Sequence, residues 1–482
     1  DNLGSVQLQR GAASVNYGSS GIGGVVDLRT RSGFDFGDSG RIEGEIGSND
    51  YRRGAVGLAY SEDRWAVSFE TSALSTDNER ENDEYERVSF TQRLDYKLND
   101  VLSFELVGRY TDADKEAPGR VSNPSGFAYG ETENWLLSPG IRYATDELSM
   151  HFFYSRTEFD REGVDDFGSP FPFESSVKSD ELSLQVDVSL WEDVLLTGGA
   201  NYRGDKPQSS NNLGFKTRFE QVGGFVQLIA PVTDSLELRG GIRADHFSEY
   251  DDVLTGDLEI IYFIESWQAS IFASVANSYS PPTGQDLIFD GDPDTPVDPE
   301  ESVSYELGLR KNFDEHDLEL ELVYFRNKIE DLIVFEYDFV NFVFDGFNEE
   351  EAVTEGVEAG FTYQLTEKLF LSGSYAYLTA VNETDDERLS KRPRHTIQAA
   401  AEIDVTEDFG FGLHATSYID RVGFGGADLD DFIVVNLVAD WRITEDWTAF
   451  ARADNLFGKD YELSADYPAL GRAGYMGVRY SF

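Results

Sequence analysis

Apolar and polar residues alternate with a period of two along most of the chain. Residues 182–190 show the pattern, with leucine or valine at even positions and serine, glutamine or aspartate at odd ones. The alternation recurs at 237–245 and 317–324. Since successive side chains of a β-strand point to opposite faces, each stretch predicts a strand with one apolar and one polar face. The pattern indicates an all-β protein, and it fits both a soluble sandwich and a membrane barrel.

The connections between these predicted strands alternate in length. Short polar turns are expected at 61–63, 99–100, 145–147, 191–193, 233–235, 366–368, 406–408 and 444–446. Longer segments rich in Gly, Pro, Asp or Asn lie between them, for example at 111–133, 160–176, 277–300 and 338–351. Outer-membrane barrels have short turns on one side of the membrane and longer loops on the other. The rhythm therefore favours a membrane barrel over a sandwich.

The strand count also favours a barrel. Following the rhythm from Arg41 to Phe482 predicts about 22 strands, an even number that returns the chain to its starting side. Most strands run roughly 9 to 14 residues, enough for a tilted crossing of a bilayer. The last strand alternates through Met476, Val478 and Tyr480 and ends on an aromatic residue. This ending resembles the C-terminal strand that bacterial barrel-insertion machinery receives, so we expect an all-β transmembrane antiparallel barrel.

Composition excludes several other classes of protein. The 39 basic and 91 acidic residues give a net charge of −52, which disfavours nucleic acid as a partner and fits solvated loops and lumen in a saline habitat. The absence of cysteine excludes disulfides, thiolate metal sites and cysteine nucleophiles. No apolar run reaches the about 18 residues of a transmembrane helix. The first residues lack a basic start and an apolar core, so we expect a signal peptide to be absent or removed.

The first 30 residues contain a specific motif. Residues 6–18, VQLQRGAASVNYG, and 21–30, GIGGVVDLRT, resemble the end of the plug domain of TonB-dependent receptors. A dinucleotide-binding loop is the rival interpretation, but the spaced third glycine is absent and no helical pattern follows. The resemblance implies that residues 1–32 are the C-terminal part of a plug and 33–482 the receptor barrel. It also implies that most of the plug is missing, including the short box that contacts TonB.

Further motifs extend the resemblance to the C-terminal half. They are SPPT at 280–283, DPEESVSYELG at 298–308, YFRNKIEDLI at 324–333, TEGVE at 354–358, RPRHT at 392–396 and DNLFGKDY at 454–461. The family implies a bacterial outer-membrane receptor and active transporter for a scarce, bulky nutrient, a ferric siderophore or cobalamin. Its implied partners are the TonB–ExbB–ExbD complex, outer-membrane lipid and lipopolysaccharide. A passive porin and an outer-membrane barrel enzyme are the alternatives.

Two glutamates are candidates for a contact between plug and wall. Apolar residues occupy the odd positions around Glu306 and Glu358, so both side chains should point inward. The resemblance implies that they pair with a plug arginine, here Arg10, in an ionic lock. The alternative is that both glutamates line a wet lumen with the other acidic residues.

Other candidate residues lie in the predicted outer loops. Aromatic residues there are candidate substrate contacts, namely Phe127, Tyr129, Phe167, Phe171, Tyr279 and Phe289. The run Asp290, Asp292 and Asp294 has the oxygen density of a calcium site, the one exception to an expected lack of cofactors. Five histidines, His151, His246, His316, His395 and His414, show no ligand spacing, and no Gly-x-Ser-x-Gly motif occurs. We therefore expect no enzyme activity.

Overall fold

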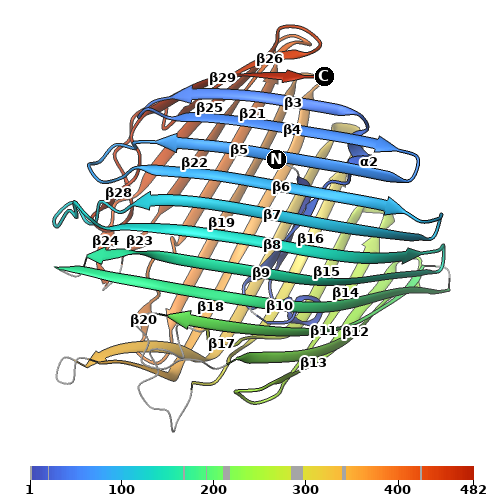
Figure 1. The fold of residues 1–482 in the computed structure, drawn as a ribbon. Helices are drawn as coiled ribbons and strands as arrows, with labels where there is room; N and C mark the ends of the chain where they lie inside the picture. Colours follow the sequence, from blue (N-terminus) through green and yellow to red (C-terminus); the bar gives the residue numbers. More distant parts are fainter. Residues whose placement is uncertain are drawn as a thin grey trace.

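A closed barrel of antiparallel strands dominates the fold (Figure 1). The computed structural model describes residues 3–19, 21–166, 169–191, 193–209, 218–283, 297–338, 343–423 and 426–482. Within these ranges 22 strands form the wall, which confirms the predicted all-β barrel and its even strand number. The last wall strand, β29, pairs with the first, β3, and closes the sheet. Closure leaves no unpaired edge, as a sheet in lipid requires.

The wall strands follow one another in chain order. The first half consists of β3 (Ser39–Gly47), β4 (Arg52–Glu62), β5 (Trp65–Thr76), β6 (Tyr85–Lys97), β7 (Leu102–Glu116), β8 (Tyr129–Ala144), β9 (Leu148–Asp166), β10 (Pro170–Trp191), β11 (Val194–Ser209), β12 (Phe219–Thr233) and β13 (Leu236–Phe247). The second half consists of β14 (Val253–Ile264), β15 (Ala269–Ser280), β16 (Glu300–Phe313), β17 (Leu318–Asp338), β18 (Val343–Thr366), β19 (Leu369–Asn382), β21 (His395–Asp404), β22 (Phe409–Ile419), β25 (Phe432–Arg442), β26 (Trp447–Asp454) and β29 (Ala473–Ser481).

The two ends of the barrel differ in their connections. At one end, called the turn end, strands are joined by tight turns or by the short 3-10 helices η1 (Glu265–Trp267) and η2 (Asp314–His316). Asp63 and Asp317 take positive φ in such turns, a conformation that aspartate tolerates better than most residues. The other end, called the loop end, has the longer connections. It includes the short strands β20 (Glu387–Arg388), β23 (Arg421–Val422), β24 (Asp428–Leu429), β27 (Glu462–Ser464) and β28 (Tyr467–Pro468).

Several strands are longer than the sequence pattern predicts. Strands β9, β10, β17 and β18 contain 19, 22, 21 and 24 residues, whereas a tilted strand crosses a bilayer with about 9–11. They therefore continue as hairpins past the membrane at the loop end. The segments 160–176 and 338–351, expected to be loops, are largely strand for this reason. Continued pairing satisfies their backbone groups, and polar residues are tolerated on both faces outside lipid.

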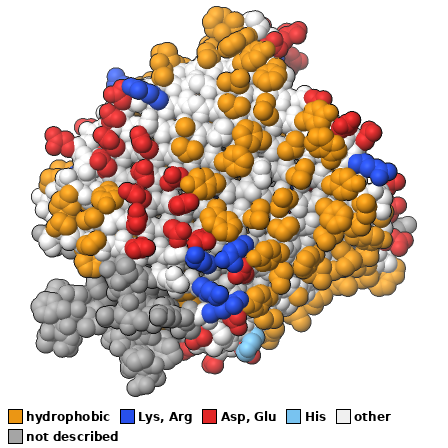
Figure 2. Space-filling model, in the orientation of Figure 1, with side chains coloured by type: hydrophobic (Ala, Val, Ile, Leu, Met, Phe, Trp, Pro, Cys, Tyr) orange, Lys and Arg blue, Asp and Glu red, His pale blue; other side chains and the backbone are white. Residues whose placement is uncertain are grey.

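The outward face of the wall has an apolar belt, which appears as the broad orange band in Figure 2. The predicted alternation is confirmed on β16, where Val303, Tyr305, Leu307 and Leu309 are 37%, 52%, 55% and 41% exposed. Acidic side chains flank the belt (Figure 2). Among the described residues, none of the helices has the length and apolar character of a membrane span.

The first part of the chain lies inside the barrel and is drawn in dark blue in Figure 1. It comprises β1 (Leu3–Arg10), α1 (Ser14–Tyr17), β2 (Gly24–Thr30) and α2 (Gly33–Phe36), and is called the inner segment. Strands β1 and β2 form an antiparallel hairpin that is separate from the wall sheet. Helix α1 contacts β12 to β15, and α2 contacts β4 to β6. The predicted boundary between residues 32 and 33 falls between β2 and α2.

Candidate functional site

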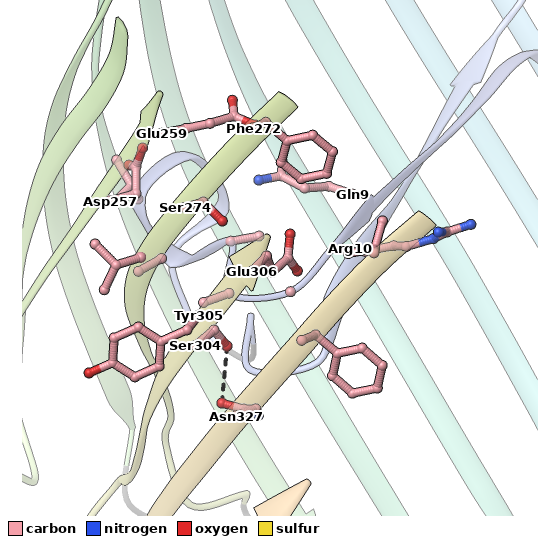
Figure 3. Close-up of a pocket in the computed structure, with 18 of the residues that line it drawn as sticks. Gln9, Arg10, Asp257, Glu259, Phe272, Ser274, Ser304, Tyr305, Glu306 and Asn327 are labelled. Carbon is pink, nitrogen blue, oxygen red and sulfur yellow. Dashed lines mark hydrogen bonds between the residues drawn. The ribbon is translucent and has the colours of Figure 1, made fainter. Parts of the chain in front are cut away.

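A cavity of about 850 Å³ separates the inner segment from one side of the wall (Figure 3). Strands β12 to β18 line its outer side, and residues 8–16 with 22–23 line its inner side. Its charged lining residues are Arg10, Arg239, Arg310, Arg326, Asp257, Glu259, Glu306, Glu321 and Glu358. Ser304 Oγ donates a hydrogen bond to Asn327 Oδ1 at 3.0 Å, drawn dashed in Figure 3. Charged and apolar side chains share the lining, so the cavity is not a purely hydrophobic space.

Arg10, at the end of β1, bridges the inner segment and the wall. Its Nη1 donates to Oε2 of Glu358 on β18 at 2.8 Å and lies 3.7 Å from Oε2 of Glu321 on β17. Glu321 also accepts a hydrogen bond from Nε of Arg310 at 3.0 Å. The Arg10 side chain is 55% exposed and that of Glu358 35%. An ion pair this open contributes about 1 kcal/mol or less to stability.

Glu306 lies against the backbone of Gly11. A Cβ atom at Gly11 would overlap Oε1 of Glu306, and the φ of Gly11 is +70°. The positive φ favours glycine at this position, and the absence of a side chain leaves room for the Glu306 carboxylate. The structure thus brings Arg10, Glu306 and Glu358 to one cavity. Their action as a releasable lock stays a prediction.

A second contact between the inner segment and the wall is far more buried. Ser14 of α1 is 1% exposed and Tyr279, near the end of β15, is 0% exposed. The backbone N–H of Tyr279 donates to Ser14 Oγ at 3.4 Å. Gly18 follows α1 with φ +78°, and a Cβ there would lie 3.0 Å from Nη2 of Arg243. We call Ser14, Gly18, Arg243, Asp245 and Tyr279 the anchor site.

A bidentate ion pair forms the centre of the anchor site. Nε and Nη2 of Arg243 donate to Oδ2 and Oδ1 of Asp245 at 2.6 and 2.7 Å, and the two side chains are 3% and 0% exposed. Gln221 Nε2 donates to Asp245 Oδ1 at 2.8 Å and to the Tyr279 hydroxyl oxygen at 3.1 Å. Arg243 Nη2 also donates to Asn201 Oδ1 at 2.6 Å. The parallel fork satisfies both buried charges, so removing one partner would be costly.

Two tyrosines near the anchor site stay uncharged at neutral pH. Burial raises the pKa of Tyr250, between β13 and β14, to about 12, and its ring lies 4.8 Å from that of Phe247. Burial also raises the pKa of Tyr17 in α1, and the Asp27 carboxylate adds to the shift. Neither phenol therefore adds charge beside the buried ion pair.

The end of the inner segment is tied to the opposite side of the wall. Nη1 of Arg93 on β6 donates to the Thr30 carbonyl oxygen at 2.9 Å, and Ser32 Oγ donates to Asp95 Oδ2 at 2.7 Å. Arg93 Nη2 also pairs with Asp95 and Glu105, each at 2.9 Å. Ser32 caps α2 through a capping box, which fixes where the chain turns into the wall. The inner segment is thus attached to the wall at Arg10, at the anchor site and at its C-terminal end.

The aromatic residues predicted to contact substrate differ in their surroundings. Phe127, Tyr129 and Phe171 are 40%, 42% and 47% exposed towards the loop end. Tyr279 is a correction: its ring packs at 5.7 Å from that of Phe247 and it contacts α1, because the inner segment covers it. Phe167, Phe289, Asp290, Asp292 and Asp294 lie outside the described residues. In the part of the chain that the structure describes, no three potential metal ligands cluster.

Glu321 and most of the anchor site were not predicted from the sequence. Alternation on β17 does indicate that Glu321 faces inward, but it cannot show which inward carboxylate lies level with Arg10. Arg243 and Asp245 share an inward face for the same reason, since they are two residues apart on β13. Only the placement of α1 and Gly18 brings this wall pair against the inner segment.

Comparison with known proteins decides the family. A family model described as "TonB dependent receptor-like, beta-barrel" matches residues 13–456. This chain belongs to the TonB-dependent receptor family. It is therefore an outer-membrane protein of a bacterium, and the turn end of the receptor faces the periplasm.

Related receptors cover nearly the whole chain. A vitamin B12 transporter of Photobacterium profundum is 24% identical over 499 residues, which is 99% of this chain and 79% of that protein. The FrpB iron transporter of Neisseria meningitidis superposes with a TM-score of 0.85 at 16% identity, over 100% of this chain and 88% of that one. The ferripyoverdine receptor of Pseudomonas aeruginosa gives a TM-score of 0.83 at 14% identity, over 99% and 76%. These two structures support the fold of this receptor.

Replacing Arg10 by alanine is expected to loosen the inner segment and raise the ion conductance of the receptor in a planar bilayer. The change removes the hydrogen bond to Glu358 and takes away the cation beside Glu306, Glu321 and Glu358, so these carboxylates repel one another more strongly. Arg239→Ala is the matched control, because Arg239 lines the same cavity but pairs with the wall residues Glu237 and Glu259. Equal conductance in the Arg10→Ala variant and the unmodified protein would show that the ionic lock is wrong.

Proposed function

We propose that this receptor is an active transporter for a scarce, bulky nutrient, a ferric siderophore or cobalamin. The solute binds at the loop end and enters the periplasm when the TonB–ExbB–ExbD complex supplies energy. The proposal rests on one observation above all: the inner segment is held inside a wide barrel by contacts of unequal burial. An occupied lumen favours gated passage over free diffusion.

In this proposal residues 1–32, which include β1, α1 and β2 of the inner segment, act as the C-terminal part of a plug. The open ion pair of Arg10 with Glu358 is the contact that yields first when the plug is pulled, since water competes for both charges. The polar cavity beside it then becomes the start of a passage along β12 to β18. Glu306 belongs to the wall and stays in place when Arg10 moves with the plug, so the cavity keeps a carboxylate in its lining.

The proposed ligand classes are consistent with the names of the related proteins. Vitamin B12 and iron carriers both occur among them, so the fold accommodates either cargo. At the loop end we propose Phe127, Tyr129 and Phe171 as contacts for the solute, since exposed aromatic rings bind large, partly apolar ligands. Phe167, Phe289 and a calcium ion on Asp290, Asp292 and Asp294 remain proposals from the sequence.

Binding of a ligand panel tests this function. The full-length protein in detergent is titrated with cobalamin, haem and several ferric siderophores, and the quenching of its six tryptophans is recorded. We expect one member to bind saturably with a dissociation constant below about 1 µM. Phe171→Ala should weaken that binding, whereas Phe409→Ala, on β22 at the turn end, should leave it unchanged.

The same preparation separates the alternatives. No binding together with a steady ion conductance would replace the transporter by a passive porin. Turnover of a lipid or peptide substrate would replace it by a barrel enzyme. If the ligand binds saturably but cells show no TonB-dependent uptake, the protein is a receptor without active transport.

A further inference from the structure

Basic side chains gather at one place on the outer surface of this acidic protein. Figure 2 shows a group of blue side chains at the edge of the orange belt, on the side towards the loop end. Strands β9, β10 and β11 and the residue before β12 each supply one cation to this edge, namely Arg156, Lys178, Lys206 and Arg218. We call these four residues the basic rim patch. It is notable in a chain with 39 basic and 91 acidic residues.

Strand register places the patch just beyond the lipid-facing surface. One cross-strand row is formed by Tyr154, Leu182, Tyr202 and Val222, which pair in turn. Leu182 and Val222 are 42% and 52% exposed, so the row faces lipid. Arg156 lies two residues beyond this row, and Lys178 and Lys206 lie four beyond it, on the same face. At about 3.3 Å per residue, the cations lie roughly 7 to 13 Å along the strands past the apolar row.

The cations of the patch are incompletely neutralised. Three of them have a carboxylate partner: Arg156 with Asp180, Lys178 with Glu158, and Arg218 with Glu220. Lys206 is exposed, and within the described ranges it has no ion-pair partner. It lies directly opposite Lys178 in the ladder of β10 and β11. Like charges opposite each other in a sheet repel, and an anion bound between them would turn that repulsion into attraction.

Two tyrosine hydroxyls lie between the cations and the apolar belt. Nη2 of Arg218 donates to the Tyr202 hydroxyl oxygen at 2.6 Å, and its guanidinium lies 6.0 Å from the centre of the Tyr202 ring. The Tyr154 hydroxyl donates to Asp180 at 2.7 Å. Tyrosines with an apolar ring and a polar tip are typical of the boundary between hydrocarbon and headgroups. The surface thus changes from apolar to phenolic to cationic over a few residues.

We propose that the basic rim patch binds the phosphate of a membrane lipid in the outer leaflet. Lys178 and Lys206 bind the phosphate, and the acyl chains lie along the apolar row that includes Leu182 and Val222. A free phosphate ion would use the cations alone, whereas a lipid also covers the apolar row. The order of groups on the surface matches the order of groups in a lipid, which favours the lipid. The patch lies outside the barrel, so the proposal is independent of transport.

Lipid binding to purified protein tests the proposal. Protein in an uncharged detergent is titrated with bis-phosphorylated lipid A, and the lipid-bound fraction is measured by native mass spectrometry. We expect the double variant Lys178→Gln/Lys206→Gln to bind at least tenfold more weakly than the unmodified protein. Glu158→Gln removes a competing carboxylate from the same patch and should strengthen binding. Arg442→Gln, a cation at the turn end, should have no effect.

The controls distinguish a bound lipid from a bound phosphate ion and from apolar adsorption. Lipid A stripped of both phosphates should bind no better to the unmodified protein than to the double variant. Inorganic phosphate should fail to displace the bound lipid at millimolar concentration. Equal binding by the double variant, or full displacement by inorganic phosphate, would overturn the proposal. Heat-dependent gel migration of each variant establishes that its barrel is folded. The Glu158→Gln variant tests the patch by a gain of lipid binding rather than by a loss.

Discussion

Replacing Arg243 by alanine is expected to loosen α1 from the barrel wall. While α1 is in place, Asp245 would stay buried without its cation, and this destabilises the closed arrangement by roughly 3–5 kcal/mol. A change of that size shifts a local opening equilibrium by about two orders of magnitude or more. The chain has no cysteine, so Val15→Cys introduces a single thiol in α1 at a position that is 3% exposed. Labelling of this thiol by a maleimide reports how often α1 leaves the wall. We expect labelling to accelerate about 100-fold in the Arg243→Ala background.

Arg10→Ala in the same Val15→Cys background is the matched control. It removes an arginine from the other contact between the inner segment and the wall, where the side chain is 55% exposed. An open ion pair is worth about 1 kcal/mol at most, so labelling should rise by about fivefold or less. Equal acceleration by both substitutions would contradict the view that the anchor site holds the inner segment more firmly than Arg10.

An arginine in place of Leu413 is expected to destabilise the barrel by roughly 2–4 kcal/mol, the cost of that side chain near the middle of the membrane. Leu413 of β22 is 37% exposed and pairs with Ala401 and Leu437 on the neighbouring strands, so it faces lipid in the belt. The measurement is the free energy of urea-induced unfolding of the protein in lipid vesicles.

The adjacent substitution His414→Arg serves as the control. His414 follows Leu413 on the same strand, but it lines the lumen with Gln398 and Thr416, where water solvates a charge. We expect its free energy of unfolding to stay within about 1 kcal/mol of that of the unmodified protein. A large loss of unfolding free energy in His414→Arg, with no loss in Leu413→Arg, would reverse the assignment of inner and outer faces.

Most of the barrel could be predicted from the sequence. Alternation gives the two faces of each strand, and it placed Glu306 and Glu358 inward because a one-residue shift would expose every apolar side chain to the wrong solvent. The predicted strand count matched because turn chemistry marks each reversal of the chain. Strand lengths were less predictable, since β9, β10, β17 and β18 extend beyond the membrane, where hydrophobicity no longer constrains the pattern.

The candidate site was only partly predictable. Arg10 and Glu358 were expected to meet from the family resemblance, and the structure places them at 2.8 Å. Tyr279 was expected in the outer loop 277–300 as a substrate contact, yet it lies near the end of β15 and α1 covers it. Glu321 was indistinguishable from its inward neighbours until the register of β17 with the inner segment was known.

The sequence by itself determined that the chain is a closed antiparallel barrel with an apolar outer face, because these properties depend on local alternation and turn residues. Only the tertiary structure decided which inward side chains meet the inner segment. Contacts such as Ser14 with Tyr279, 265 residues apart, depend on where α1 lies in the lumen. The basic rim patch likewise exists only through the register of four strands, since its cations are scattered between residues 156 and 218. Such placements follow from closing the sheet and filling its interior, which no local pattern encodes.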